Sequence, residues 1–441
     1  MSNVSAMIKK SEVDYSTEKI QERNNIFVCH PWSPMNTNHS KLMLFRGKGY
    51  RVWDVNGKSY IDCCSLNSTC GYANDDISKP IYQQLLKFHG IDLSLASNEP
   101  VGELSEKLAS LLPKELSRTL FVNSGSEGVE AAIFIAASYW EQIEQPRYRL
   151  VSFADGYHGS TFGARSISQL PRIVQPFGSL ISSTYVQLPA ASKDMRKPEL
   201  LASLLEKFEK ALKNEEQPPM AVIVEPFLNV GGSVQFPVGF LAGLRKLCDE
   251  AGALLILDEV FTAYARTGKM FAFEHESITP DILVSSKGLA GGYMPITAVT
   301  MKEKIHATFD KDIHIGGVRY GHTTSGHAVA CVAALATLDL IERENLCERA
   351  ELFGKQLISE FSVFAGRGDI IDVRGIGLIF VIEMSSYEMC SKFKFLAQEK
   401  GLLVRQSGVT IKVVPPLIVD SQGIEEISHI IKLCLEQGGF I

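Results

Sequence analysis

Short apolar strands that alternate with amphipathic helices are the feature that most limits how this chain can fold. The strands are expected at 150–153, 221–224, 254–257 and 282–284, and the helices at 199–212 and 239–250. Because the strands are apolar at nearly every position, both of their faces must be buried. Strands of this kind, joined by helices, form a mostly parallel sheet that helices cover on both faces. The sequence therefore predicts an α/β fold.

Residues able to carry chemistry stand at or just after the expected strand ends. They are Ser124, Tyr157, Glu225, Asp258 and Lys287. The carboxyl ends of the strands are where sheets of this class bind their ligands. Convergence of five separate segments on that edge predicts one active site there.

Lys287 stands just past the apolar run 282–284. A lysine where a buried strand ends can lose its proton through desolvation and act as an amine nucleophile. Glycines at 288, 291 and 292 would let a flat cofactor approach the backbone. A surface lysine before a turn is the alternative, and only the surrounding motifs argue against it.

Asp258 comes after four apolar residues and should be largely dehydrated. A buried carboxylate is costly unless a cation pairs with it. A protonated pyridine nitrogen is one such cation, because an aspartate keeps that nitrogen charged and the ring able to accept electrons. The structural alternative is an ion pair with Arg266.

Ser124 and Glu127 have the spacing of a capping box at the start of a helix that extends to about Trp140. A small-residue loop opening a helix presents free N–H groups and the positive end of the helix dipole, which suits a phosphate. A well-capped helix without a ligand is the alternative.

Composition narrows the class of protein. The chain has 441 residues, enough for two or three domains, and its net charge of −6 argues against a nucleic-acid or anionic-membrane partner. Nine cysteines without a C-x-x-C pair fit neither a metal site nor a disulfide framework, which favours the cytoplasm. Residues 1–22 lack the apolar core of a signal peptide, no stretch is long enough to span a membrane, and an irregular arm is expected to about residue 25.

Eight short motifs resemble, in their order, those of the class III pyridoxal-phosphate (PLP) aminotransferases. They are Asn123–Glu127, Gly156–Gly159, Val224–Pro226, Asp258–Val260, Arg266–Gly268, Pro280–Asp281, Ser286–Gly288 and Gly321–His327. The resemblance extends from about residue 40 to Leu417. It implies PLP fold type I: a large domain with a mainly parallel seven-stranded sheet covered by helices, a small α+β domain from both chain ends, and a homodimer with shared active sites. The expected division is 1–80 for the N-terminal arm and part of the small domain, 81–330 for the large PLP-binding domain, and 331–441 for the C-terminal small domain.

The resemblance also implies roles for the residues around the cofactor ring. Lys287 would form the Schiff base with PLP and then move the substrate proton. Asp258 would pair with the pyridinium nitrogen, with His158 also at the cofactor. Val260 would pack on one face of the ring. Tyr157 would stack on the other face, where it also meets the substrate.

Further implied contacts concern the phosphate and its surroundings. Ser124, Gly125 and Ser126 would hold the phosphate. Thr323 would reach the phosphate of the neighbouring subunit's cofactor. Glu225 is expected among the cofactor-binding residues.

Substrate recognition is less well defined by the resemblance. The stretch 401–408 resembles the ω-amino-acid:pyruvate and diaminopelargonate branches, in which an arginine at the position of Arg405 binds a substrate carboxylate. The ornithine branch has an arginine near the position of Lys412. A surface arginine on an edge strand is the alternative for Arg405. The segment 63–72 is shorter than usual and lacks tryptophan, and Phe261 replaces a residue that contacts the cofactor in many relatives, so substrate preference cannot be transferred.

The function that the resemblance implies is a ping-pong aminotransferase. It would move an amino group from an amine or amino-acid donor to a keto or aldehyde acceptor through Lys287. The alternatives are an aminomutase, racemase or epimerase on the same fold, and a catalytically inactive relative that only binds small molecules.

Overall fold

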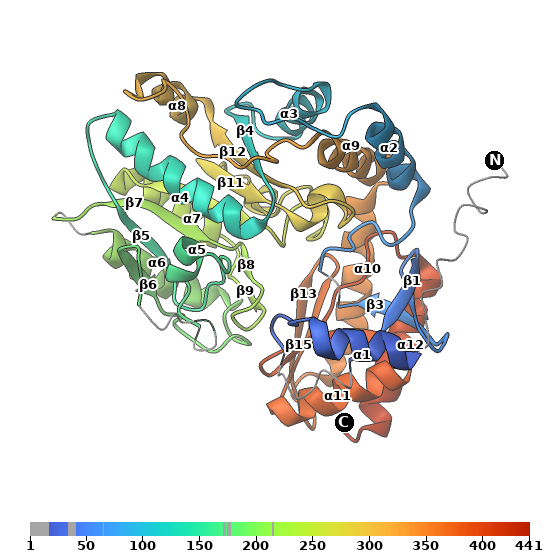
Figure 1. Ribbon diagram of the computed structural model, residues 1–441. Helices are drawn as coiled ribbons and strands as arrows, with labels where there is room; N and C mark the ends of the chain where they lie inside the picture. Colours follow the sequence, from blue (N-terminus) through green and yellow to red (C-terminus); the bar gives the residue numbers. More distant parts are fainter. Residues whose placement is uncertain (1–16, 34–40, 65, 171–172, 174–177, 214–215) are drawn as a thin grey trace.

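Two seven-stranded sheets, one in each of two lobes, organise the chain (Figure 1). The computed structural model describes residues 17–33, 41–64, 66–170, 173, 178–213 and 216–441. The first and last parts of the chain meet in the smaller lobe, where blue and red elements lie together (Figure 1). Among the described helices, none is long and apolar enough to cross a membrane.

The large sheet has the order β4-β12-β11-β10-β7-β5-β6. Only β12 runs antiparallel to its neighbours, so the other six strands end at the same edge. The strands are β4 (Leu116–Val122), β5 (Arg149–Phe153), β6 (Ser183–Val186), β7 (Pro219–Val224), β10 (Leu254–Glu259), β11 (Ile282–Ser285) and β12 (Thr297–Lys302). The predicted mainly parallel sheet is therefore confirmed.

Alternation along each strand explains why helices cover both faces of this sheet. In β10, Leu254 and Ile256 pack in the same hydrophobic cluster as α4 (Gly125–Gln142). Leu255 and Leu257 pack in the cluster that holds the apolar residues of α6 and α7. Successive side chains of a strand point to opposite faces, so a continuous apolar run needs a helix on each side. The two helices on that second face are α6 (Leu201–Leu212) and α7 (Phe240–Ala251).

The small sheet combines strands from both ends of the chain, in the order β1-β2-β3-β15-β16-β14-β13. Parallel pairing of β3 with β15 joins the two ends, and the other pairs are antiparallel. The strands are β1 (Leu44–Lys48), β2 (Arg51–Asp54), β3 (Ser59–Cys63), β13 (Ile370–Ile376), β14 (Ile379–Met384), β15 (Leu402–Ser407) and β16 (Thr410–Val413). Strands β2 and β3 form an antiparallel hairpin around Asn56–Gly57, a residue pair typical of hairpin turns.

The remaining elements pack around these sheets or connect them. The helices are α2 (Asp75–Lys87), α3 (Glu99–Leu111), α5 (Phe162–Ser166), α8 (Glu303–His306), α9 (Ala328–Arg343), α10 (Leu346–Phe361), α11 (Tyr387–Glu399) and α12 (Ser421–Gln437), and a two-stranded ribbon consists of β8 (Phe227–Leu228) and β9 (Val234–Gln235).

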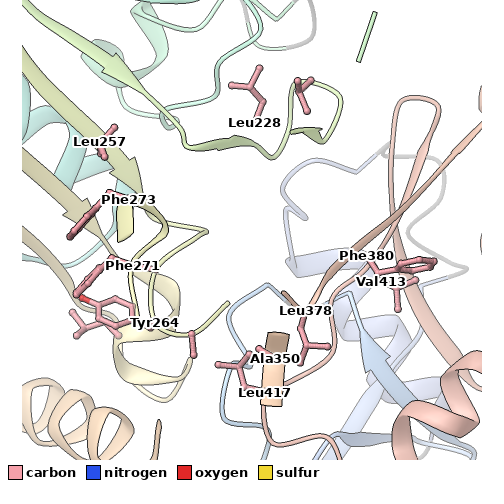
Figure 2. Packing of buried hydrophobic residues seen from close by; sticks show 14 of the residues in the cluster. Leu228, Leu257, Tyr264, Phe271, Phe273, Ala350, Leu378, Phe380, Val413 and Leu417 are labelled. Carbon is pink, nitrogen blue, oxygen red and sulfur yellow. The ribbon is translucent and has the colours of Figure 1, made fainter. Parts of the chain in front are cut away.

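One hydrophobic cluster continues from the large lobe into the small one (Figure 2). On the large-lobe side, Phe271 stacks on Phe273 at 5.5 Å and lies edge-on to Tyr264. On the small-lobe side, Phe380 and Val413 lie together, as Figure 2 shows. A shared core limits how freely the lobes can move relative to each other.

The N-terminal arm is more regular than its sequence suggested. The expectation of an irregular arm to about residue 25 is wrong for α1 (Thr17–Phe27). Good helix formers such as Glu18 and Lys19 begin this helix, and Asn24 Nδ2 donates back to the Ile20 carbonyl at 3.0 Å. Residues 1–16 and 34–40 lie outside the described part of the chain.

Arg374 ties the two lobes together from a fully buried position on β13. Its Nε donates to the Ser233 carbonyl and its Nη2 to the Gly232 carbonyl, both at 2.8 Å and both in the large lobe. Its Nη1 donates to Asp372 at 2.8 Å and to Glu383 at 2.6 Å. The small lobe therefore holds the 229–233 segment through one guanidinium.

Replacing Arg374 with methionine should strongly destabilise the fold. The substitution leaves the Glu383 carboxylate in a largely buried site without its cation, which costs about 3–5 kcal/mol. Urea unfolding followed by circular dichroism measures the change. The matched control is Arg343→Met, which breaks an exposed pair with Asp76 and should cost less than about 1 kcal/mol. Equal losses in the two variants would contradict the assigned role.

Candidate active site

A cavity of about 440 Å³ opens at the carboxyl edge of the large sheet. Nine residues predicted for the site line it: Ser124, Gly125, Ser126, Tyr157, His158, Glu225, Asp258, Val260 and Lys287. They come from the segments that follow β4, β5, β7 and β11 and from the end of β10. The convergence expected from the strand ends is therefore observed in the fold.

One end of the cavity is formed by the start of α4. Ser124 caps the helix by accepting from the Glu127 N–H at 3.3 Å, and Glu127 accepts from the N–H groups of Asn123 and Ser124 at 2.9 Å. This capping box leaves the N–H groups of Gly125 and Ser126 without a partner among the described residues. Unpaired donors at the positive end of an 18-residue helix form a site for an anion.

Gly125 also permits a close contact between two segments of the cavity wall. A Cβ atom at this position would lie 2.8 Å from Val260 Cγ1, too close for any other residue. Val260 stands two residues after Asp258 and directly after β10, so the start of α4 and the end of β10 pack against each other. The ring and phosphate sites that the sequence predicted are therefore neighbours.

Asp258 is buried and lines the same cavity. Its Oδ2 is 2.8 Å from His158 Nδ1, and its Oδ1 accepts from the Val260 N–H at 3.1 Å. The alternative ion pair with Arg266 is wrong. That guanidinium donates instead to the carbonyls of Pro415 at 2.7 Å and Leu378 at 3.3 Å. It thus joins the two lobes, and burial lowers its pKa to about 10.

Lys287 projects from a strained position at the end of β11. Its φ of +24° lies in a region that side chains other than glycine rarely adopt. Burial lowers the pKa of its amine, Asp258 and Glu225 oppose that shift, and the positive charge of Arg405 adds to it. The amine is therefore more readily deprotonated than an exposed lysine.

The glycine after Lys287 has a different purpose from the one expected. A Cβ atom on Gly288 would lie 2.9 Å from the Tyr264 Cβ, so this glycine makes room for a buried side chain. The Tyr264 hydroxyl in turn lies 2.7 Å from Ser285 Oγ at the end of β11. The glycine thus serves packing beneath the lysine, and only Gly292 of the three glycines lines the cavity.

Tyr157, Glu225 and Asn229 line the cavity together, and Glu225 connects the other two. Glu225 Oε1 accepts from the Tyr157 N–H at 2.9 Å, and its Oε2 accepts from the Asn229 N–H at 3.2 Å. The pKa of Glu225 is raised to about 7, chiefly by burial and also by the charge of Asp258, whereas His158 and the two backbone hydrogen bonds oppose this shift. Glu225 thus fixes the backbone at Tyr157 and at Asn229.

Trp32 and Asn229 are two site residues that sequence reasoning did not assign to the cavity. The Trp32 ring lies edge-on to Tyr157 with centroids 6.4 Å apart, so the N-terminal connector reaches the site. Asn229 is buried and lines the cavity. Trp32 stands outside any regular element, and Asn229 stands five residues after the end of β7. No local pattern marks either position.

The segment 63–72 reaches the cavity through Asn67. Asp62 holds this segment by accepting from the Cys64 N–H at 3.0 Å, the Ser68 hydroxyl at 3.0 Å and the Tyr72 hydroxyl at 2.6 Å. Residue 65 lies outside the described part. Phe261 also lines the cavity, but it packs against apolar residues of the small lobe.

Thr323 and Arg405 are the two predicted site residues that do not line this cavity. Thr323 is exposed on the loop before α9. Arg405 is exposed on β15, directly opposite Lys412 of β16, and is close enough to affect the pKa of Lys287. Among the described residues, no group of three or more His, Cys, Asp and Glu side chains could hold a metal ion.

The comparisons with known proteins agree on one family. The class III aminotransferase family matches residues 33–435. The adenosylmethionine-8-amino-7-oxononanoate aminotransferase of Staphylococcus aureus is 30% identical over 438 residues, which cover 94% of this chain and 97% of the relative. The acetylornithine aminotransferase of Methanopyrus kandleri is 33% identical over 397 residues, which cover 89% of this chain and 94% of the relative.

Solved structures give the same result. An (S)-enantioselective omega-transaminase from Thermomicrobium roseum superposes with a TM-score of 0.91 at 27% identity, covering 96% of this chain and 99% of that one. The omega transaminase from Pseudomonas jessenii in complex with PMP has a TM-score of 0.90 at 28% identity, with 95% and 98% covered.

The charges around Lys287 predict opposite shifts in two variants. Asp258→Asn removes a charge that raises the pKa of the lysine and should lower that pKa, whereas Arg405→Ala removes a charge that lowers it and should raise that pKa. The pH dependence of trinitrobenzenesulfonate labelling of Lys287, measured by peptide mass spectrometry on cofactor-free protein, reports the neutral amine. Shifts of the same sign in both variants would contradict this electrostatic arrangement.

Proposed function

The chain belongs to the class III aminotransferase family, and we propose how its cavity residues share the work of amino transfer. The enzyme is PLP-dependent and moves an amino group from an amine or amino-acid donor to a keto or aldehyde acceptor in two half-reactions. The observation that carries the assignment of residues is a single cavity in which Lys287, buried Asp258 and the unpaired N–H groups of α4 meet.

The donor groups of the cavity fit PLP in one orientation. The phosphate would lie at the start of α4, with the Gly125 and Ser126 N–H groups as donors and Ser126 Oγ beside them. Asp258 would accept a hydrogen bond from the pyridinium nitrogen, since a carboxylate has lone pairs beyond those that His158 and Val260 occupy. When bound, PLP supplies an electron sink that makes the donor's Cα–H bond acidic.

Lys287 is the residue that we assign to proton transfer. Its amine would first bind the cofactor covalently and then, once the donor has replaced it, accept the donor's Cα proton at Nζ. The same Nζ would return that proton to the neighbouring carbon. Burial favours this role because it lowers the pKa of the amine.

Tyr157 and Val260 would hold the ring between them and limit the entry of water. Val260 is fixed against Gly125, and Tyr157 is fixed by its N–H bond to Glu225 at 2.9 Å. The Trp32 ring, packed edge-on against Tyr157, would extend this cover on the open side. His158 would orient Asp258 rather than touch the ring, because its Nδ1 already faces the carboxylate at 2.8 Å.

We further propose a homodimer whose subunits share their active sites. The loop that carries exposed Thr323 lies beside the segment after α2, where Gly326 closely approaches Leu93 and accepts a bond from Asn98 at 3.1 Å. Large apolar side chains are exposed on α2 and this segment: Tyr82, Leu85, Leu86, Phe88 and Leu95. Exposed apolar surface of this extent supports contact with a second copy. Thr323 would then reach the cofactor phosphate of the neighbouring subunit.

Three further assignments belong to the same proposal. Arg405 would bind a substrate carboxylate, which its position opposite Lys412 and its effect on Lys287 support. The domain division at about residues 80 and 330 follows the separation of the two sheets. A reducing compartment such as the cytoplasm suits nine cysteines that are all free. The relatives named above are aminotransferases and transaminases, not mutases or racemases.

Lys287→Ala should abolish net amino transfer while the protein still binds PLP. The variant loses the covalent attachment and the proton-transferring amine, but the phosphate donors of α4 remain. Turnover between separate donors and acceptors, and PLP retention by equilibrium dialysis, measure the two effects. The control Lys246→Ala changes an exposed lysine and should behave as wild type. Near-normal turnover of Lys287→Ala without added amine would show that another lysine reacts.

Thr323→Ala should weaken PLP binding by roughly one to two decades. A hydrogen bond to a charged group is worth about 1.5–3 kcal/mol, which corresponds to that loss in affinity. PLP titration gives the affinity, and sedimentation velocity gives the state of assembly. Thr308→Ala is the control, because its hydroxyl donates to the Ile305 carbonyl of its own chain at 2.8 Å. Unchanged affinity in an intact dimer would rule out the contact between subunits.

A further inference from the structure

Lys412 reaches from the small sheet to the wall of the active-site cavity. It is buried on β16, and its Nζ donates to the backbone oxygen of Asn229 at 2.8 Å and to the side-chain Oδ1 of Asn229 at 2.7 Å. Asn229 lines the cavity and stands three residues before Gly232, whose carbonyl accepts from Arg374. The ammonium of one lobe is therefore in direct contact with a cavity residue of the other.

This contact determines which way the Asn229 amide points. An ammonium group can only donate hydrogen bonds, so it must face the amide oxygen and not the amide nitrogen. The backbone of Asn229 is fixed on the opposite side by its N–H bond to Glu225 Oε2 at 3.2 Å. The carboxamide is thus held at its oxygen, and its nitrogen is directed away from Lys412.

The amide nitrogen of Asn229 is left to the cavity. Within the described residues, Nδ2 makes no hydrogen bond to another group. It is also not one of the fully buried polar side-chain atoms that lack a partner. Two N–H donors therefore remain on a side chain that lines the cavity. Donors in that position suit an oxygen of the substrate.

We propose that Lys412 is a positioning residue that fixes Asn229 as a hydrogen-bond donor for a carboxylate oxygen of the substrate. The inference rests on the proposed function and adds a determinant of substrate class to it. Arg405 lies directly opposite Lys412 in the β15–β16 pair, so their side chains leave the sheet on the same face. A donor amide near two cations favours a carboxylate over a neutral or cationic group.

The charges on the opposite side of the cavity do not cancel this preference. Glu225 faces Asn229 from β7, but both of its oxygens accept backbone N–H groups, from Tyr157 and from Asn229. Asp258 is paired with His158. The carboxylates that line the cavity are thus held by other partners, and the side toward the small lobe is cationic.

The direct test uses Asn229→Asp, which keeps the size of the side chain and a bond acceptor for Lys412 but places an oxygen where the NH₂ group was. With pyruvate and 2-oxoglutarate as acceptors, KM should rise at least tenfold while kcat stays within about threefold, because binding changes and the reacting atoms do not. The Ki of propionate, an inert carboxylate, should rise in parallel. With butylamine as donor, kcat/KM of its half-reaction should stay within about threefold.

Variants at Lys412 separate positioning from simple packing. Lys412→Met frees the amide to rotate and should reproduce the loss for keto acids, whereas Lys412→Arg keeps a donor at the amide oxygen and should stay within about threefold of wild type. PLP affinity and thermal unfolding confirm that each variant is folded, and Asn229→Ala replaces Lys412→Met if the latter is not folded.

An equal loss for butylamine and keto acids, or no change in KM and Ki, would overturn the inference. If wild type transfers no amino group to any acceptor, the proposed function fails instead.

Discussion

The burial of charged side chains at the carboxyl edge of the large sheet is the constraint on which the rest of this structure depends. Asp258, Glu225 and Lys287 stand together where apolar strands end, and each would be costly alone. His158 faces Asp258, backbone N–H groups hold Glu225, and burial lowers the pKa of Lys287. The same arrangement that makes the burial tolerable leaves the Lys287 amine with a lowered pKa.

The side chains that the small lobe contributes at this edge of the large sheet are cations and not a second set of catalytic groups. Arg374 and Lys412 both donate to the 229–233 segment, and Arg266 donates in the reverse direction to carbonyls of the small lobe. The hydrophobic cluster beneath them is continuous between the lobes. Hydrogen bonds are directional and thus define where the lobes meet, while the apolar contacts hold the two lobes together. We infer that substrate preference is set at this junction.

Several features could be predicted because they depend on neighbours in the sequence. The capping box of Ser124 and Glu127 spans one helical turn, and the alternation in β10 needs only successive residues. The partner of Asp258 could not be obtained in this way. Arg266 is nearer in the sequence, but the fold brings His158 to Asp258 from one hundred residues away.

The sequence by itself determined the parallel sheet, the edge where the chemistry lies and the lysine, aspartate and helix start that stand there. Periodic burial and strand-end position are local properties, so they can be read along the chain. Only the tertiary structure decided that Trp32 reaches Tyr157, that Gly288 makes room for Tyr264 and that Lys412 orients Asn229. Those contacts depend on how two lobes built from distant segments pack against each other, and no local pattern encodes that geometry.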